Sequence, residues 1–217
     1  MPDRSQSHEM TTHRESTSDV PAVIRPTLLD DIPSIAALIA ANRFRSDGSG
    51  ALLPVSPQQI LRMLGDEDLG RFFTAVAPSG EVVGCVSVAV YGMPSNHQEV
   101  IAWLANRLPA DDFGIQHDAN DDLGQMAELR SLAVSDAFRG RQLGLQLIET
   151  AKAEARSRGF GQLYSLVNRD VVGLFERAGF CRATRPPAKL IIDCAVCPLL
   201  DHCVEIPVVA EVIRSRT

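Results

Sequence analysis

A predicted strand that runs through a short loop into a long helix constrains this chain more than any other feature. The sequence predicts a strand over residues 126–134 and a helix over residues 142–158, which Gly159 ends. The apolar residues of the helix share one face: Leu147, Ile148, Ala151 and Ala155. The chain is therefore expected to be an α/β protein in which this helix packs on a sheet.

The loop between strand and helix is predicted to bind an anion. It holds the hexad Arg139-Gly140-Arg141-Gln142-Leu143-Gly144. The first-turn amides of a helix have no internal acceptors and lie at the positive end of the helix dipole, so such a terminus binds phosphate or pyrophosphate. Arg139 and Arg141 add positive charge, and Gly140 and Gly144 let a ligand approach the backbone. The alternative is an ordinary strand–turn–helix unit with exposed arginines.

Further strands and helices are predicted on both sides of this unit. One helix follows a carboxylate cap at Asp30-Asp31, and another begins at Pro57 after a Ser56 cap. The remaining expected elements are a strand over 22–25, a hairpin of 71–77 with 81–91 around Pro78-Ser79-Gly80, a strand over 163–167, a short helix over 169–178, and an extended apolar segment over 188–213.

Composition excludes several classes of protein. The 217 residues include 21 Lys and Arg against 27 Asp and Glu, a net charge of −6, whereas a nucleic-acid binder needs a basic face. No apolar run approaches the roughly 20 residues that cross a bilayer, and residues 1–19 are too polar for a secretory signal. We expect a cytoplasmic protein without membrane or nucleic-acid partners, whose five cysteines are thiols or metal ligands.

The domain organisation is predicted to be simple. Residues 1–20 are expected to form a disordered tail, and residues 21–217 a single domain. An insert over 92–122 carries an acidic run from Asp111 to Asp122, interpreted as a solvated loop. A C-terminal hairpin over 188–213 carries a cysteine cluster.

These features resemble the GCN5-related N-acetyltransferase (GNAT) superfamily. The hexad is similar to its Arg/Gln-x-x-Gly-x-Gly/Ala loop, and Asn168 precedes Phe175 by the family's spacing, ahead of Gly179-Phe180. The order of strands and helices also fits. The resemblance implies a mixed, mostly antiparallel sheet, flanked by helices, with a splay between two parallel strands.

The resemblance also implies an acetyl-CoA site. The hexad Arg139 to Gly144 would hold the pyrophosphate, and the edge Leu132-Ala133-Val134 would pair with pantetheine, near Asn168 and Phe175. An amide near Ala133 or Val134 would meet the oxyanion. Gln142 stands where the family has a glycine, a departure of little consequence if that position has helical dihedrals. Phe175 stands where many relatives have a tyrosine, so it cannot protonate the leaving thiolate.

Three segments are similar to the acetyltransferase unit of N-acetylglutamate synthase: Leu52 to Ser56, Ala127 to Leu132, and a tail with Cys194, Cys197 and Cys203. The resemblance implies acetylation of the α-amine of glutamate or another small amino acid, with Leu53 at the acceptor site. Val55 replaces an arginine of that family. Acetylation of another amine (a polyamine, an antibiotic or a protein amine) and a degenerate acyl-CoA sensor are the alternatives, and a homodimer is left open.

Two residues on the 126–134 strand are candidates for the chemistry. Glu128 is the candidate general base, against a surface or salt-bridged carboxylate. Strand alternation puts Arg130 on the same face, where it would hold an acceptor carboxylate or pair with Glu128.

The cysteines are treated separately from the catalytic residues. Cys194, Cys197 and Cys203 either hold zinc with His202 or, as favoured here, are reduced thiols that shape the hairpin. Cys85 and Cys181 are expected in the core, and Trp103 in packing.

Overall fold

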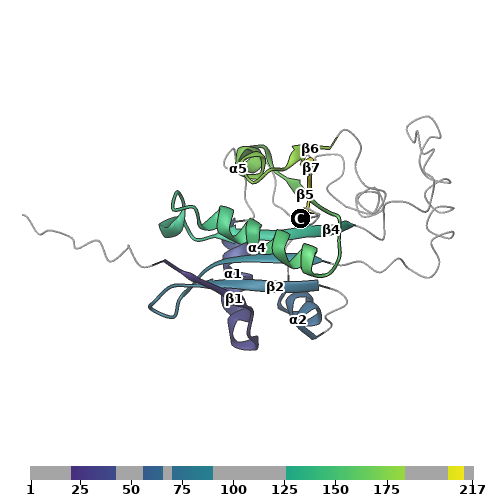
Figure 1. Ribbon diagram of the computed structural model, residues 1–217. Coiled ribbons are helices and arrows are strands. Elements are labelled where there is room, and N and C mark those ends of the chain that lie inside the picture. Colours follow the sequence, from purple (N-terminus) through teal and green to yellow (C-terminus); the bar gives the residue numbers. More distant parts are fainter. Residues whose placement is uncertain (1–20, 43–55, 66–69, 90–125, 184–204, 213–217) are drawn as a thin grey trace, which may run out of the picture.

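A mixed sheet in the order β1-β2-β3-β4-β5-β7-β6 organises the part of the chain that the computed structural model describes (Figure 1). The structure describes residues 21–42, 56–65, 70–89, 126–183 and 205–212. The seven strands of these ranges are β1 (Val23–Pro26), β2 (Gly70–Val76), β3 (Val82–Ala89), β4 (Met126–Val134), β5 (Gln162–Val167), β6 (Cys181–Arg182) and β7 (Ile206–Glu211). The predictions for residues 1–20, Leu53, Val55, the insert over 92–122 with Trp103, and Cys194, Cys197, His202 and Cys203 lie outside these ranges.

Helices cover both faces of the sheet. One face carries α4 (Leu143–Ser157) and α5 (Val172–Arg177), preceded by the 3-10 turns η2 (Asp136–Phe138) and η3 (Arg169–Val171). The other face carries α1 (Ile32–Asn42) and α2 (Pro57–Gly65), after the 3-10 turn η1 (Leu29–Asp31). Figure 1 shows α4 running across the front of the sheet, close to β4. The four residues predicted on the apolar face of α4 are all fully buried.

The strand directions confirm the mixed, mostly antiparallel sheet. Within the described ranges β4 and β5 are the parallel pair, and the other neighbours are antiparallel. The hairpin of β2 and β3 closes through the predicted turn, where Ala77 N donates to Glu81 O at 2.8 Å. β7 lies inside the segment expected to be extended, and it enters the sheet between β5 and β6.

The two cysteines of the described ranges differ in environment. Cys85 is fully buried in the core under α1 and α2, as predicted, and burial raises the pKa of its thiol to about 12. The prediction that Cys181 lies in the core is wrong, because Cys181 is exposed on the short edge strand β6. The preceding residue, Phe180, is buried, so the apolar sequence around Cys181 does not indicate the burial of the cysteine side chain.

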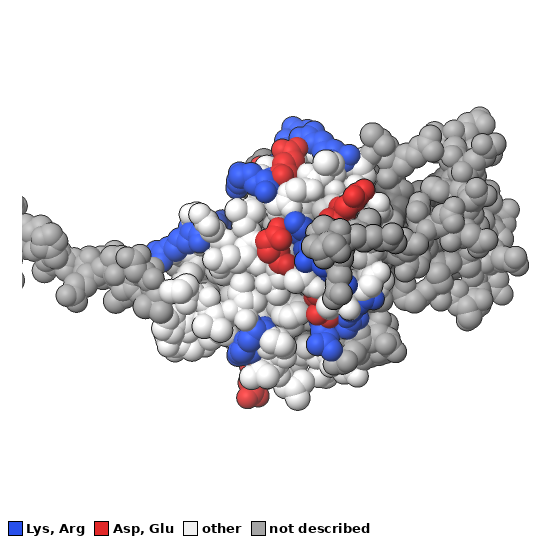
Figure 2. All heavy atoms as spheres, in the orientation of Figure 1, with Lys and Arg blue, Asp and Glu red and all other residues white. Residues whose placement is uncertain are grey.

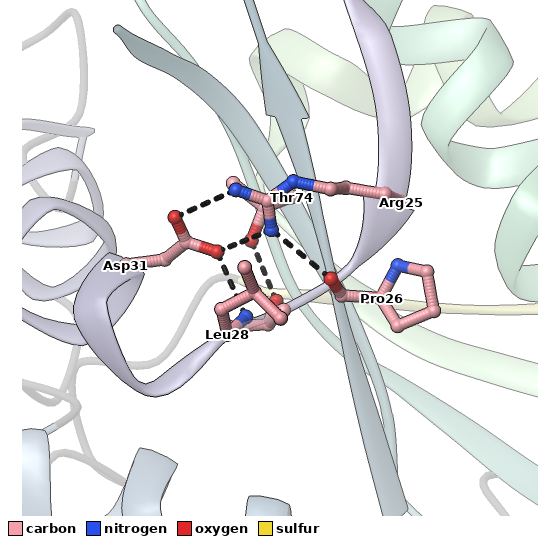
Figure 3. A network of polar contacts seen from close by, with 6 residues as sticks. Arg25, Pro26, Leu28, Asp31 and Thr74 are labelled. Atoms are coloured by element: carbon pink, nitrogen blue, oxygen red, sulfur yellow. Dashed lines mark hydrogen bonds and ion pairs between the residues drawn. The ribbon is translucent and has the colours of Figure 1, made fainter. Parts of the chain in front are cut away.

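An ion pair attaches β1 to the start of α1. Two nitrogens of Arg25 donate to the two carboxylate oxygens of Asp31, at 2.6 and 3.0 Å (Figure 3). The same carboxylate accepts the backbone N–H of Leu28 at 2.8 Å. Next to it, the hydroxyls of Thr27 and Thr74 are 2.6 Å apart. The predicted carboxylate cap is therefore Asp31, acting on the 3-10 turn before α1.

This arrangement makes stability depend on acid pH. The hydrogen bond from Arg25 holds the pKa of the buried Asp31 carboxyl below its usual range, against the opposing effect of burial. A carboxyl whose pKa is lower in the folded than in the unfolded state stabilises the fold above the unfolded pKa of about 4. The stabilisation is lost as the pH falls through the folded pKa.

We predict that Asp31→Asn lowers the free energy of unfolding at pH 7 by about 1–2 kcal/mol, because the charge-assisted bonds to Arg25 are lost. The difference from the wild type shrinks as the pH falls below about 4 and disappears below the folded pKa, where wild-type Asp31 is itself protonated. Urea denaturation from pH 7 to pH 2 measures it, with Asp30→Asn, an exposed neighbour, as the matched control. A loss of stability that is the same at every pH contradicts the assignment.

Candidate active site

The parallel strands β4 and β5 separate after a short stretch of pairing. They pair from Met126 with Gln162 to Glu128 with Tyr164, whereas β4 continues to Val134. The register thus confirms the predicted splay, and it places Glu128 at the last paired position. Beyond that point, no strand of the described ranges pairs with the β5-facing edge of β4.

A serine hydroxyl marks the start of the splay. Ser165 Oγ donates to Leu129 O at 2.7 Å, one residue beyond the last paired position on each strand. Both groups are buried, so this bond satisfies a carbonyl that the ladder no longer reaches. Sequence reasoning missed Ser165, because only the register of β4 on β5 shows that its hydroxyl faces a strand carbonyl.

The direction of the β4 amides follows from the ladder to β3. Ser135 N donates to Val83 O at 2.9 Å, and Val134 lies opposite Gly84. In an antiparallel ladder, residue pairs that exchange backbone hydrogen bonds alternate with pairs that do not. The N–H and C=O of Ala133 therefore face β3, and those of Leu132 and Val134 face the splay. Of the two amides expected to meet an oxyanion, the geometry favours Val134.

Glu128 is a buried carboxyl in the middle of the sheet. It is 9 % exposed, with Ala89 beside it on β3 and Tyr164 beside it on β5. Tyr164 is itself buried at 3 % exposure. This burial excludes a surface carboxylate, and a carboxyl at the start of an opening in the sheet is well placed to act on a bound amine.

A β-bulge at Arg130 interrupts the alternation of β4. Ser131 lies opposite Ser87, but Leu129 lies opposite Val88, so Arg130 is an extra residue. Leu129 and Leu132 consequently both pack in the core under α4. The bulge interrupts the strict alternation that put Glu128 and Arg130 on one face: Arg130 is exposed, Ser131 lies on the face of Glu128, and the role of Arg130 stays a prediction.

The loop before α4 adopts two left-handed conformations. Gly140 has φ +76° and Gln142 has φ +63° with ψ 0°. The condition of helical dihedrals at Gln142 is not met, because the helix begins at Leu143 and Gln142 precedes it as the cap. Gln142 O accepts the N–H of Gln146 at 3.0 Å. Only glycine adopts this conformation without strain, which explains why glycine is usual at this position.

Gly144 lies against a side chain of α5. A Cβ added to Gly144 would lie 3.2 Å from Leu174 Cδ2 on α5, whereas one added to Gly140 would meet nothing within 4 Å. Gly144 therefore allows α5 to approach the first turn of α4. That Gly140 and Gly144 also let a ligand approach the backbone stays a prediction.

Both loop arginines are held on the protein surface beside the start of α4. Arg139 Nη2 donates to Asn42 Oδ1 at 2.6 Å and lies 3.0 Å from Asp136 Oδ1. The Arg141 guanidinium stacks over the Phe138 ring at 5.3 Å. The contact to Asn42 joins the loop to the last residue of α1, which belongs to the opposite face of the sheet.

The two residues predicted beyond β5 lie in different environments. Asn168 caps the turn η3 through its backbone, and its side-chain oxygen is buried with no hydrogen-bond partner among the described residues. Phe175 is 2 % exposed and packs edge to face on Phe180, with ring centroids 5.1 Å apart. The structure thus places the Phe175 ring in the core under α4 and α5; its contact with the cofactor stays a prediction.

The surface in front of α4 carries mixed charge. Figure 2 shows basic and acidic side chains interspersed over the described part of this face. Among the described residues no group of three His, Cys, Asp or Glu side chains is arranged to bind a metal ion. None of the helices described is both long and apolar enough to span a bilayer.

Comparison with known proteins identifies this architecture. The sequence matches the acetyltransferase (GNAT) family over residues 40–180. The chain belongs to this family. It is 27 % identical over 164 residues to an uncharacterized N-acetyltransferase of Chlorobaculum tepidum, covering 75 % of this chain and 81 % of that one. The protein is thus an N-acetyltransferase of the GNAT family, and acetyl-CoA is its co-substrate.

Two solved structures share the fold at low sequence identity. N-acetylglutamate synthase from Neisseria gonorrhoeae, complexed with coenzyme A and N-acetyl-glutamate, superposes with a TM-score of 0.62 at 19 % identity. It covers 91 % of this chain, whereas this chain covers 36 % of that enzyme's length. The GNAT-family protein YhbS from Escherichia coli, in complex with CoA, gives a TM-score of 0.53 at 20 % identity, over 90 % of this chain and 83 % of its own.

We predict that Gln142→Gly raises the free energy of unfolding by a few tenths to about 1 kcal/mol. Glycine relieves the left-handed strain, and its extra freedom in the unfolded chain offsets part of the gain. Gln146→Gly is the matched control: the same replacement in right-handed α4 lowers stability by about 0.5–1 kcal/mol. Urea denaturation measures both. Equal losses in the two variants contradict the assigned conformation of Gln142.

Proposed function

We propose that this enzyme transfers an acetyl group from acetyl-CoA to the α-amine of a small amino acid, with glutamate as the leading candidate. The observation that carries the proposal is the buried Glu128 at the point where β4 and β5 separate, next to the exposed Arg130. A carboxylate there suits the ammonium group of the acceptor, and a guanidinium beside it suits a carboxylate. An α-amino acid carries both groups.

The similarity to N-acetylglutamate synthase supports glutamate among the amino acids. That enzyme's structure was determined with N-acetyl-glutamate, and it covers most of this chain. The sequences Leu52 to Ser56 and Ala127 to Leu132 also resemble that family. Because this chain covers only 36 % of that enzyme's length, its whole activity is not carried over with the fold.

The cofactor is proposed to lie along the splay and the loop before α4. The first-turn amides of α4 and the guanidinium groups of Arg139 and Arg141 face the pyrophosphate, and the backbone of Leu132 and Val134 pairs with the pantetheine arm. Asn168, whose buried side-chain oxygen is unsatisfied in the described structure, accepts a hydrogen bond from the same ligand. Leu143, Gly144 and Phe175 shape this site through packing.

The reaction follows from these positions. Glu128 removes a proton from the acceptor ammonium, directly or through a water molecule, and the free amine attacks the thioester carbonyl. The Val134 N–H donates to the oxyanion of the tetrahedral intermediate, whose nitrogen gives its second proton to water as the intermediate collapses to the amide and the thiolate of coenzyme A. Phe175 carries no proton to give, so the thiolate leaves unprotonated or takes a proton from water.

An acceptor panel tests the proposed substrate class. We expect release of coenzyme A with glutamate or another small amino acid, measured by a thiol assay across amino acids, polyamines and aminoglycoside-type amines. A Michaelis constant for acetyl-CoA below about 1 mM is expected for an enzyme of this kind. Turnover with a polyamine alone removes the amino-acid proposal. Binding of acetyl-CoA without turnover of any acceptor favours a sensor.

We predict that Glu128→Gln lowers kcat/KM by about 100-fold or more, because the amide cannot accept the ammonium proton. The rate–pH profile of the variant also loses the acidic limb that reports the base. Steady-state kinetics from pH 5 to pH 9 measure both effects. Glu149→Gln, an exposed carboxylate on α4 that pairs with Lys152, is the matched control and keeps full activity. An unchanged rate in Glu128→Gln assigns the base to another group.

A further inference from the structure

The face of the sheet that carries Glu128 changes from apolar to polar within a few residues. Under α1 and α2, this face holds Cys85 and Ala133 side by side. The next residues on the same face are Ser87 and Ser131, which lie directly opposite each other on β3 and β4. Glu128 follows, opposite Ala89. The serine pair therefore separates the apolar core under α1 and α2 from the candidate base.

The bulge at Arg130 is what brings this group together. Without the extra residue, Ser131 would lie on the α4 face, because side chains alternate along a strand. With it, Ser131 and Glu128 share a face although they are three residues apart. Opposed side chains have Cβ atoms about 5 Å apart, and the serine pair lies about 7 Å along the strands from Glu128.

Among the described residues, the Ser87 hydroxyl has no hydrogen-bond partner. Ser87 is fully buried, and its Oγ is unsatisfied in the structure. Such a hydroxyl destabilises a fold, so each one requires an explanation. By contrast, the buried hydroxyl of Ser165 donates a hydrogen bond to the Leu129 carbonyl. The Ser87 hydroxyl lies on the same face of the sheet as the candidate base Glu128. A hydrogen-bond acceptor that arrives with the substrate explains why this hydroxyl is unsatisfied.

From this geometry we propose that Ser87, together with Ser131, hydrogen-bonds the carboxylate of the acceptor while Glu128 receives the proton of its amine. Two hydroxyl donors on adjacent strands match the two oxygens of a carboxylate. The neighbouring positions carry small residues, Ala89 on β3 and, opposite it, Gly70 on β2. This inference rests on the proposed amino-acid acceptor, and it makes Ser87 a determinant of specificity.

Replacement of Ser87 tests the inference through two readouts of opposite direction. We expect Ser87→Ala to raise KM for the amino-acid acceptor by about tenfold or more, because a hydrogen bond to a charged group is lost. KM for acetyl-CoA stays within about twofold. The melting temperature rises or stays the same, because the substitution removes an unsatisfied buried hydroxyl. Ser165→Ala, the matched stability control, melts at a lower temperature because its buried bond to Leu129 is lost.

A change in the acceptor separates the carboxylate contact from a general disturbance of the site. With the carboxamide of the same amino acid, which lacks the negative charge, we expect the effect of Ser87→Ala on KM to fall to about threefold or less. Ser131→Ala shows the same pattern and provides a second variant should Ser87→Ala fold poorly. An equal effect on acid and carboxamide overturns the carboxylate assignment.

The inference and the proposed function fail in different measurements. The acceptor panel with the wild-type enzyme decides whether an amino acid is the substrate. Ser87→Ala with an unchanged KM for the acceptor that the wild type uses overturns the role of Ser87, whatever that acceptor is. If the wild type uses an amino-acid acceptor and both serine variants keep the wild-type kinetics, the proposed function stands and this inference alone is removed.

Discussion

The separation of β4 from β5 is the constraint on which the rest of this structure depends. Two parallel strands that pair over three positions and then diverge leave one edge of β4 without a partner strand among the described residues. Unpaired backbone groups are costly inside a protein, so the opening persists only because other contacts hold it. β3 pairs with the far edge of β4, Ser165 satisfies the Leu129 carbonyl, and α4 packs across the face. The backbone groups along this edge of β4 can then form hydrogen bonds with a ligand that carries amide groups.

The loop at the end of β4 depends on the same arrangement, and each of its unusual residues has its own physical reason. Gly140 and Gln142 turn the chain through left-handed conformations, so that α4 starts directly beyond the open edge. Gly144 admits Leu174, which brings α5 against the first turn of α4. Arg139 reaches Asn42 at the end of α1. The loop thus connects the helices of the two faces beside the start of α4, where positive charge and free amides coincide.

Polar groups that weaken the fold gather where the chemistry is proposed. Glu128 is buried within the sheet, and within the described part of the chain the Ser87 hydroxyl and the buried Asn168 side-chain oxygen have no hydrogen-bond partner. Other buried or partly buried polar groups are paired, as in the contacts of Arg25 with Asp31 and of Thr27 with Thr74. Proteins commonly depart from local rules of stability at functional sites, where a ligand supplies the missing partner. The contrast between these two sets of residues supports the position of the proposed site.

Local signals in the sequence were sufficient for much of the fold. The helical spacing of apolar residues predicted α4, the sequence Ser56-Pro57 predicted the start of α2, and the turn at residues 78–80 predicted the β2–β3 hairpin. The hexad Arg139 to Gly144 located the loop before α4, and with the spacing of Asn168 and Phe175 it indicated the acetyltransferase family. These signals are readable because caps, turns and amphipathic faces depend on residues close together in the chain.

The tertiary structure alone decided the features that depend on pairing between distant segments. The bulge at Arg130, the exposure of Cys181 and the entry of β7 between β5 and β6 have no local sequence signal. The face that a β-strand residue occupies depends on the register with its neighbours, and a single extra residue reverses it. Glu128 was identifiable from the sequence as a candidate, whereas its grouping with Ser87 and Ser131 was not. That grouping exists only because two strands from distant parts of the chain, β3 and β4, pair in one particular register.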